Sequence, residues 1–245
     1  MLEQLDLYIK SADTSELFSN LGVKLHGFIM SRIDSDYAKR LHNPREHTPF
    51  SLFVFDSGEG FICRISTLTD EASQILDAMQ NVGKIKVYGI TEPLTIENMI
   101  RSNPIVRQDI VRIVTKKKYV LNFITPAVYK KDGKFCNMPE LYRYFRTVVE
   151  KINRFESMDI EYRDIAEIFE SYLKVGEYRY ESSSYLLGGY IIPAMIGGAS
   201  ISIAARKEES DNKPEILRLL LGYATFSGVG GKTSLGMGGT LLIGE

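Results

Sequence analysis

The chain has little of what disulfide-stapled or cysteine-rich metal proteins require. Its 245 residues include two cysteines, Cys63 and Cys136, and no short spacing joins them. This argues against a disulfide framework and a cysteine metal site, and favours a reducing compartment. No stretch approaches the ~18 uninterrupted apolar residues of a membrane span. The first residues lack a basic start followed by an apolar run, so we expect a cytoplasmic protein with no membrane partner.

A strong charge of either sign is also missing. Lysine and arginine total 30 against 31 aspartates and glutamates, so the net charge is −1. The chain is no polycation, and any contact with nucleic acid must come from local basic patches. Hydrophobic residues make up 44% of the chain and charged residues 25%. These values are ordinary for a globular protein with one large domain or two small ones.

The first half alternates between strand-like and helix-like spacing of its apolar residues. Asp13 is well placed to cap the first helix, with Glu16 three residues later. We expect, in order, a strand at 5–9, a helix carrying an apolar stripe to residue 33, strands at 50–55 and 61–65 joined by a turn at 56–60, a helix at 69–79 and a strand at 84–90.

The second half repeats that order. We expect a strand at 120–128, helices at 139–154 and 164–173, strand-like segments at 174–181 and 201–206 with extended chain between them, a helix from Pro214 to Phe226, and a closing strand at 240–243. Two successive β-α-β-β-α-β halves predict an α+β protein of two tandem ferredoxin-like domains. We assign them to residues 1–118 and 119–245.

Residues 227–239, hereafter the glycine segment, hold six glycines in thirteen positions. Ordered glycine costs more backbone entropy than any other residue, and the usual gain is close approach of backbone N–H groups to an anion such as phosphate. We therefore expect phosphate contacts here from Gly228, Gly230, Gly231, Lys232, Thr233, Gly236 and Gly238. A plain loop between the last helix and the last strand is the alternative.

The glycine segment does not fit a nucleotide loop. Counting back from Lys232, the first glycine of a mononucleotide loop falls at position 226, which is Phe226. That loop also runs from a strand into a helix, whereas here a helix leads in and a strand leads out. The dinucleotide fingerprint Gly-x-Gly-x-x-Gly is absent as well. An ATP or GTP site is therefore disfavoured.

The glycine segment, the stretch 123–129, and Leu41-His42 followed by 48–51 occur in an order and spacing that resemble the CRISPR repeat-RNA processing endoribonucleases of the RAMP superfamily. The resemblance covers nearly the whole chain. It implies a cut within the repeat of a precursor CRISPR RNA that needs neither metal nor cofactor. The ribose 2′-OH attacks the adjacent phosphorus and leaves a 2′,3′-cyclic phosphate and a 5′-OH. It also implies crRNA products, and dimerisation or association with effector complex subunits.

Such a reaction needs a base, an acid and positive charge at the phosphate. Histidine suits both proton roles because its ordinary pKa is about 6.5, and the chain has three, His26, His42 and His47. The resemblance makes His42 the catalytic histidine. His47 belongs to the same loop, where the family commonly has lysine. His26 is either catalytic or a partly buried packing residue beside the apolar stripe.

Some relatives carry a tyrosine base in the first helix, where this chain has Met30. Tyr37 is a weaker substitute, so a histidine pair acting without tyrosine is the preferred hypothesis. A zinc site built from the three histidines is disfavoured, because no cysteine or carboxylate completes a recognisable spacing.

Four basic clusters are candidates for contact with RNA, although each can equally be a solvated surface. Arg143 and Arg146 are three residues apart and can share one helical face. Tyr142 and Tyr144 can stack on unpaired bases or pack on the core. The other clusters are Lys116–Lys118, Lys130 and Lys131 with Lys134, and Arg206–Lys207. A non-cleaving RNA-binding subunit of a CRISPR effector complex is the alternative function, and a nucleotide-dependent enzyme comes third.

Overall fold

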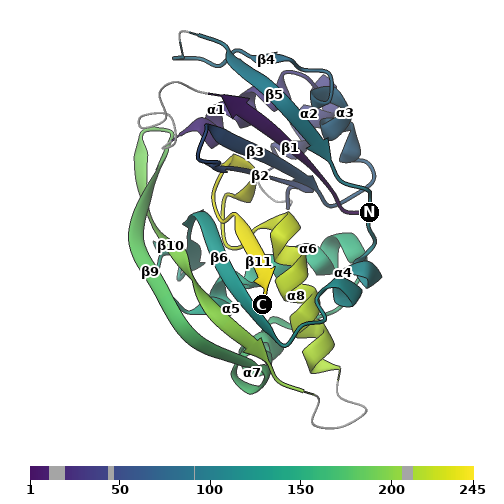
Figure 1. The fold of residues 1–245 in the computed structure, drawn as a ribbon, viewed down its shortest axis with the longest axis vertical. Helices are drawn as coiled ribbons and strands as arrows, with labels where there is room; N and C mark the ends of the chain where they lie inside the picture. The colour runs from purple at the N-terminus through teal and green to yellow at the C-terminus, as the bar shows by residue number, and fades with distance from the viewer. Residues whose placement is uncertain (11–19, 44–46, 91, 206–211) are drawn as a thin grey trace.

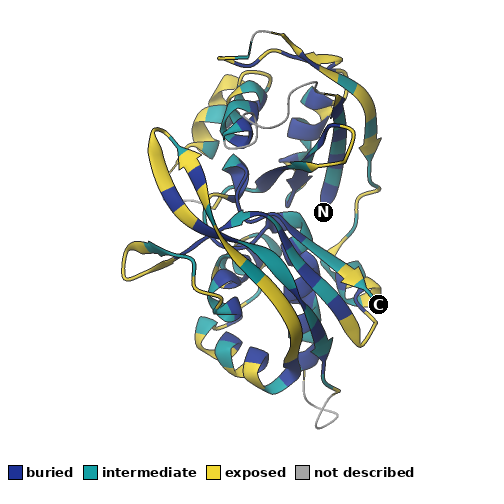
Figure 2. Ribbon diagram, turned by 60° about the vertical axis from the view of Figure 1, so that its left-hand side comes forward, coloured by how far each residue is buried: buried dark blue, intermediate teal, exposed yellow. Residues whose placement is uncertain are grey.

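The chain folds into two modules, each built on an antiparallel sheet, that follow one another along the long axis of the molecule (Figure 1). This computed structural model describes residues 1–10, 20–43, 47–90, 92–205 and 212–245. Buried residues gather inside each module and where the two modules meet (Figure 2).

The first sheet has the ferredoxin-like strand order β2-β3-β1-β5-β4. Along β1, Leu5, Leu7 and Ile9 are buried and alternate with half-buried residues, so one face is turned to the core. That face packs against helices α1 and α3. The elements are β1 (Glu3–Lys10), α1 (Leu21–Met30), α2 (Ser35–Leu41), β2 (Phe50–Asp56), β3 (Phe61–Thr67), α3 (Ser73–Met79), β4 (Lys84–Ile85) and β5 (Leu94–Arg101).

Two predictions for this half need correction. The first helical region divides in two, because the Asp34 carboxylate accepts from the amides of Asp36 and Tyr37 and starts a new helix. Only β4 forms within 84–90, and the long fourth strand is β5. A bulge opposite Tyr8 and Ile9 shifts the apolar period of β5, which hid this strand from the sequence pattern. The predicted cap Asp13 lies outside the described residues.

The connection between the two sheets packs with the second module. Helix α4 (Arg107–Ile113) places Ile110 in the second hydrophobic core, together with Val114. Gly222 of α8 (Lys213–Ser227) lets these two side chains approach its backbone. The second sheet begins at Lys118. The predicted domain boundary between residues 118 and 119 stays a prediction.

The second sheet has the order β11-β6-β10-β9, which repeats the strand permutation of the first. Its strands are β6 (Lys118–Ala127), β9 (Leu173–Leu187), β10 (Tyr190–Ile203) and β11 (Thr240–Gly244). The predicted tandem ferredoxin-like fold is thereby confirmed. The β9–β10 hairpin extends past the sheet toward the first module (Figure 1), where Val23 of α1 packs against its side chains. Arg206 and Lys207 lie outside the described residues.

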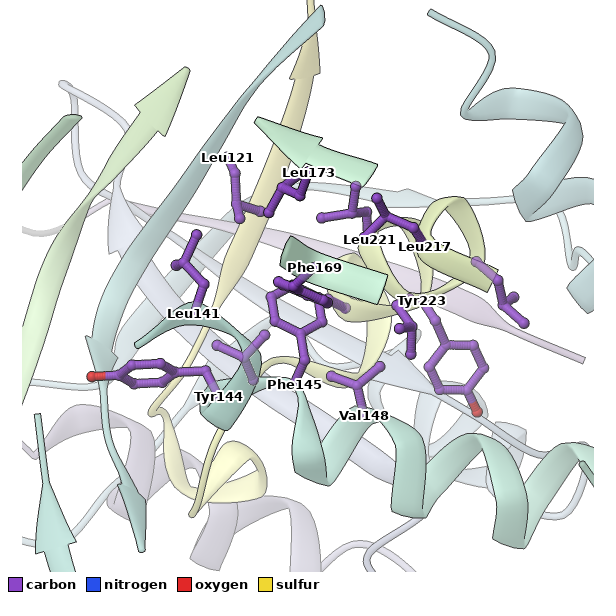
Figure 3. Close-up of a cluster of buried hydrophobic side chains, with 14 of the residues drawn as sticks. Leu121, Leu141, Tyr144, Phe145, Val148, Phe169, Leu173, Leu217, Leu221 and Tyr223 are labelled. Atoms are coloured by element: carbon purple, nitrogen blue, oxygen red, sulfur yellow. The ribbon is translucent and has the colours of Figure 1, made fainter. Parts of the chain in front are cut away.

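The second core forms between this sheet and helices α5 (Leu141–Tyr144), α6 (Arg146–Glu156), α7 (Tyr162–Tyr172) and α8 (Lys213–Ser227). Figure 3 shows Leu, Phe and Val side chains from these helices gathered in one buried cluster that includes Leu121 of β6. The helix expected at 139–154 is interrupted at Phe145, whose ring lies 5.1 Å from that of Phe169. A short hairpin of β7 (Tyr129–Lys131) and β8 (Lys134–Cys136) follows β6.

The glycine segment lies where the two modules meet. It leads from α8 through the short helix η1 (Thr233–Leu235) into β11. A Cβ atom added to Gly22 of α1 would lie 2.7 Å from the Gly236 Cα, and one added to Gly239 would lie 2.8 Å from the Phe53 ring of β2. Glycine at positions 22 and 236 lets the backbones of the two modules come into direct contact, and glycine at 239 leaves room for the Phe53 ring.

Replacing Gly230 with alanine should destabilise the protein more than replacing Gly133. Both glycines have positive φ, 68° and 77°, which costs an alanine ~1–2 kcal/mol. A Cβ on Gly230 would also overlap the Val128 carbonyl oxygen, whereas Gly133 faces open space. Overpacking adds about 1–3 kcal/mol. Urea unfolding of the two variants measures the difference, and equal losses would show that the glycine segment accepts a side chain there.

Candidate functional site

The backbone of the glycine segment is largely committed to contacts within the protein. The amides of Gly228, Gly230, Gly231 and Gly238 donate to the carbonyls of Ala224, Tyr144, Val128 and Pro126, at 2.8–2.9 Å. Gly236 is buried against Gly22 and the Tyr185 hydroxyl. The amides of these four glycines are therefore already satisfied within the protein, which does not favour the phosphate contacts expected from them.

Lys232 is the part of this segment that faces solvent. It adopts a left-handed conformation with φ 65°, and its side chain lines a cavity of about 290 Å³. Lys130, Arg143 and Arg146 line the same cavity. The structure thus brings Arg143, Arg146 and Lys232 together from α5, α6 and the glycine segment.

Carboxylates orient the two arginines of this basic cavity. The Arg143 Nε donates to Glu140 at 2.5 Å, and the Arg146 Nε donates to Glu150 at 2.9 Å. The Arg143 guanidinium also covers the ring of Tyr142 at 5.1 Å from its centre. The clamped guanidinium groups keep further N–H donors for a second anion.

The remaining predicted RNA contacts are dispersed or buried. Tyr144 is 0% exposed, so it packs on the core and does not stack on a base. Lys116–Lys118 lie at the start of β6, while Lys130 follows the end of that strand. Thr233 is buried, and its hydroxyl oxygen accepts from Lys151 at 2.8 Å.

His26 and His42 form a pair at the junction of the modules. Their ring centres are 5.7 Å apart, with the planes at 78°. His26 is on α1, and His42 caps the C-terminus of α2. The His26 Nδ1 lies 3.0 Å from the Ser234 carbonyl oxygen, so the glycine segment reaches the pair directly.

Backbone carbonyls determine how both rings are protonated. The His42 Nδ1 lies 2.7 Å from the Ala38 carbonyl oxygen, which matches the contact of His26 with Ser234. A carbonyl only accepts, so each Nδ1 carries the hydrogen. In the neutral ring each Nε2 then keeps a lone pair that can take up a proton.

The surroundings of His26 favour its neutral form. Burial lowers the pKa of His26 below its ordinary value, and the nearby His42 acts in the same direction, while the Ser234 carbonyl opposes the shift. The ring stacks on Phe50 at 5.7 Å with a 17° angle between planes. His26 is thus a neutral, oriented imidazole near pH 7.

His47 lies toward α6. Its Nε2 is 3.7 Å from a Glu150 carboxylate oxygen. Burial lowers the pKa of His47, with Lys151 and Arg154 acting in the same direction and Glu150 opposing them. Because Glu150 also contacts Arg146, His47 is linked to the basic cavity.

Tyr37 does not have the surroundings of a base. It is 4% exposed, and burial raises its pKa to about 12. The Arg40 guanidinium lies over its ring at 5.2 Å. A buried phenol that retains its proton cannot activate a hydroxyl near neutral pH, so the catalytic role predicted for Tyr37 is not supported.

Comparison with known proteins identifies the family that this chain resembles. The sequence model of the family described as CRISPR-associated endoribonuclease Cas6 matches residues 121–240. A CRISPR-associated endoribonuclease Cas6 of Streptococcus thermophilus is 24% identical over 91% of this chain and 91% of its own length. One of Mycobacterium tuberculosis is 28% identical over 90% of this chain and 71% of its own length. The chain is thus similar to Cas6 endoribonucleases over nine-tenths of its length.

Solved Cas6 structures share the fold. A Cas6 product complex superposes with a TM-score of 0.77 at 20% identity, over 99% of this chain and all of that one. Thermus thermophilus Cas6 gives a TM-score of 0.72 at 19% identity, over 99% of this chain and 98% of its own. The resemblance inferred from the glycine segment and the His42 loop is thereby confirmed at the level of the Cas6 family.

Sequence reasoning missed three residues of this site. Ser234 contributes through its carbonyl, which no side-chain pattern can reveal. Glu150 joins His47 to Arg146. Lys151 occupies an apolar position of α6 between Val148 and Phe155, and this break in the amphipathic pattern was the available signal.

Within the described parts of the chain, no group of three or more His, Cys, Asp or Glu side chains is placed to hold a metal ion. None of the described helices is long and apolar enough to cross a membrane.

His26 should titrate below pH 6.5, and its protonation should weaken the fold. The unfolded histidine takes up a proton near its ordinary pKa of about 6.5, whereas the folded one does so at lower pH. The contribution of His26 to the free energy of unfolding is therefore complete above the unfolded pKa of about 6.5. It is lost as the pH falls from there through the folded pKa. NMR titration of the ring protons gives the folded pKa. Between pH 7.5 and 5.5, the free energy of unfolding in urea should fall less for His26→Gln than for wild type. An NMR midpoint for His26 above pH 6.5 would refute the lowered pKa.

Proposed function

We propose that this chain cuts CRISPR repeat RNA within precursor transcripts, using His26 and His42 as the proton-transfer pair. The relatives that it matches are named CRISPR-associated endoribonuclease Cas6, which supports endoribonuclease activity. Solved relatives include a Cas6 product complex and a Cas6 substrate mimic complex, which supports repeat RNA as the substrate. The observation that carries the mechanism is the pair of imidazoles that carbonyls hold through Nδ1, joined to the glycine segment through Ser234.

The proposed reaction is a transesterification. One imidazole takes the proton of a ribose 2′-OH, the resulting oxygen attacks the adjacent phosphorus, and the bond to the 5′-oxygen breaks. The other imidazole, protonated beforehand, gives its proton to that leaving oxygen. The products are a 2′,3′-cyclic phosphate and a 5′-OH, and no other reactant is consumed.

We assign the base to His26 and the acid to His42. A base must be neutral before the reaction, and burial favours the neutral form of His26. His42 is exposed at the end of α2, where it can reach a leaving group at the surface. Both rings are already oriented through Nδ1, so little reorganisation is needed at the moment of reaction.

The basic cavity would hold the RNA backbone beside the cut. Lys232 is the phosphate ligand nearest in sequence to Ser234, and Arg143 and Arg146 extend positive charge away from it. His47, paired with Glu150, would support these contacts from the side of α6. Guanidinium and ammonium groups bind phosphate by charge and by hydrogen bonding, which suits contacts that are independent of base sequence.

A non-cleaving RNA-binding subunit of an effector complex is the alternative. It would share the fold and the glycine segment but would need no pair of oriented imidazoles. The geometry of His26 and His42 favours the enzyme. Homodimerisation, association with effector complex subunits and a cytoplasmic location belong to the same proposal.

His42→Ala should slow cleavage by at least about 100-fold while RNA affinity changes little, because a positioned acid or base contributes ~10²–10⁴-fold. The assay is single-turnover cleavage of labelled repeat RNA from the source genome, with EDTA present and the product ends mapped. Lys39→Ala, on the exposed surface of α2, is the control. Undiminished cleavage by His42→Ala would remove His42 from the mechanism, and loss of wild-type cutting in EDTA would refute metal independence.

Lys232→Ala should weaken RNA binding and make it less dependent on salt. Removing one phosphate contact lowers the slope of log affinity against log salt concentration by about 1. Filter binding between 50 and 300 mM salt measures the slope, with exposed Lys84→Ala of β4 as the matched control. Identical slopes for wild type and Lys232→Ala would place the phosphate elsewhere.

A further inference from the structure

Lys151 is a buried lysine that the proposed reaction does not use. It lies on α6 and is 3% exposed. Its Nζ donates to the Ser227 carbonyl oxygen and to the Thr233 hydroxyl oxygen, both at 2.8 Å. Among the described residues no carboxylate forms a salt bridge with it. Lysine is almost never fully buried without a counter-ion, so strong local interactions must retain it here.

The two acceptors of Lys151 belong to opposite ends of one turn. Ser227 ends α8, and Thr233 begins η1. The residues between them include Lys232 of the basic cavity. Ser234, the next residue after Thr233, accepts the Nδ1 hydrogen of His26. A short series of contacts therefore runs from Lys151 through Thr233 and Ser234 to the catalytic pair.

We propose that Lys151 is a positioning residue whose two hydrogen bonds fix the first half of the glycine segment, so that Ser234 holds His26 with its hydrogen on Nδ1. This inference rests on the proposed function. Lys151 touches neither RNA nor the reacting atoms in this scheme. It acts by keeping the Ser234 carbonyl in place and by fixing the backbone that carries Lys232.

Lys151 can lose its charge near neutral pH without losing its hydrogen bonds, so its role is to position the glycine segment and not to supply a charge. Burial lowers the pKa of Lys151 to about 7, and Glu150 on the same helix opposes that shift. His47 lies in the loop before β2, and the charge of Lys151 helps to lower its pKa. A neutral lysine amine still carries two hydrogens, so both hydrogen bonds persist when the proton leaves.

The test compares Lys151→Met with two variants of its partner. Lys151→Met keeps the length of the buried side chain but removes both hydrogen bonds. Thr233→Val removes the hydroxyl that accepts from Lys151 and leaves Lys151 itself unchanged. Thr233→Ser keeps the hydroxyl. Exposed Lys84→Met controls for the loss of a lysine. Melting temperatures show which variants are folded.

Two measurements are made on each folded variant. Two-bond ¹H–¹⁵N NMR spectra at pH 7.5 report which ring nitrogen of His26 carries the hydrogen. Single-turnover cleavage at saturating and limiting RNA separates the maximal rate from RNA affinity. We expect Lys151→Met and Thr233→Val to lose the Nδ1–H signature of His26 and to lower the maximal rate by about 10- to 100-fold, the effect of a small misplacement. Thr233→Ser should behave like wild type.

The results that overturn the inference differ from those that overturn the proposed function. If wild type cuts RNA and Lys151→Met keeps both the His26 signature and the maximal rate, Lys151 is only a packing residue. If Lys151→Met does not fold, Thr233→Val decides, and an unchanged spectrum and rate refute the role. If wild type does not cut, the proposed function fails, while the NMR spectra still test the link between Lys151 and His26.

Discussion

The contact between the glycine segment and the first module is the constraint on which the site depends. Gly236 meets Gly22 of α1, and Phe53 of β2 lies against Gly239. The Tyr185 hydroxyl donates to the Leu235 carbonyl from the β9–β10 hairpin and closes the same junction. Neither ferredoxin-like module alone contains this junction, so the geometry of the site is a property of their docked state.

Docking of the two modules also brings together functional groups that come from different modules. The first module supplies both imidazoles, and the second supplies the basic cavity and the carbonyl that orients His26. Glu150 and His47 make a second link across the junction. The contact between His26 and Ser234 and the position of Lys232 beside it therefore both depend on how the two modules are docked.

The sequence predicted much of the fold because apolar periodicity is a local signal. It placed β1, β6 and α8 within a few residues and gave the tandem fold, but it lost β5, whose period is broken by a bulge. The site was harder to predict. Arg143 and Lys232 could be chosen by residue type, and His42 by the family resemblance. The burial of Tyr37 and the internal bonding of the glycine amides depend on tertiary packing, which the sequence does not show.

The anchoring of both imidazoles by main-chain oxygens has an evolutionary consequence. Enzymes that orient a histidine with an aspartate must conserve that aspartate, but every amino acid offers a carbonyl. The side chains of Ala38 and Ser234 are therefore free to drift while the rings stay aligned. In the proposed mechanism, the orientation of both rings therefore does not depend on a carboxylate side chain that evolution would have to keep.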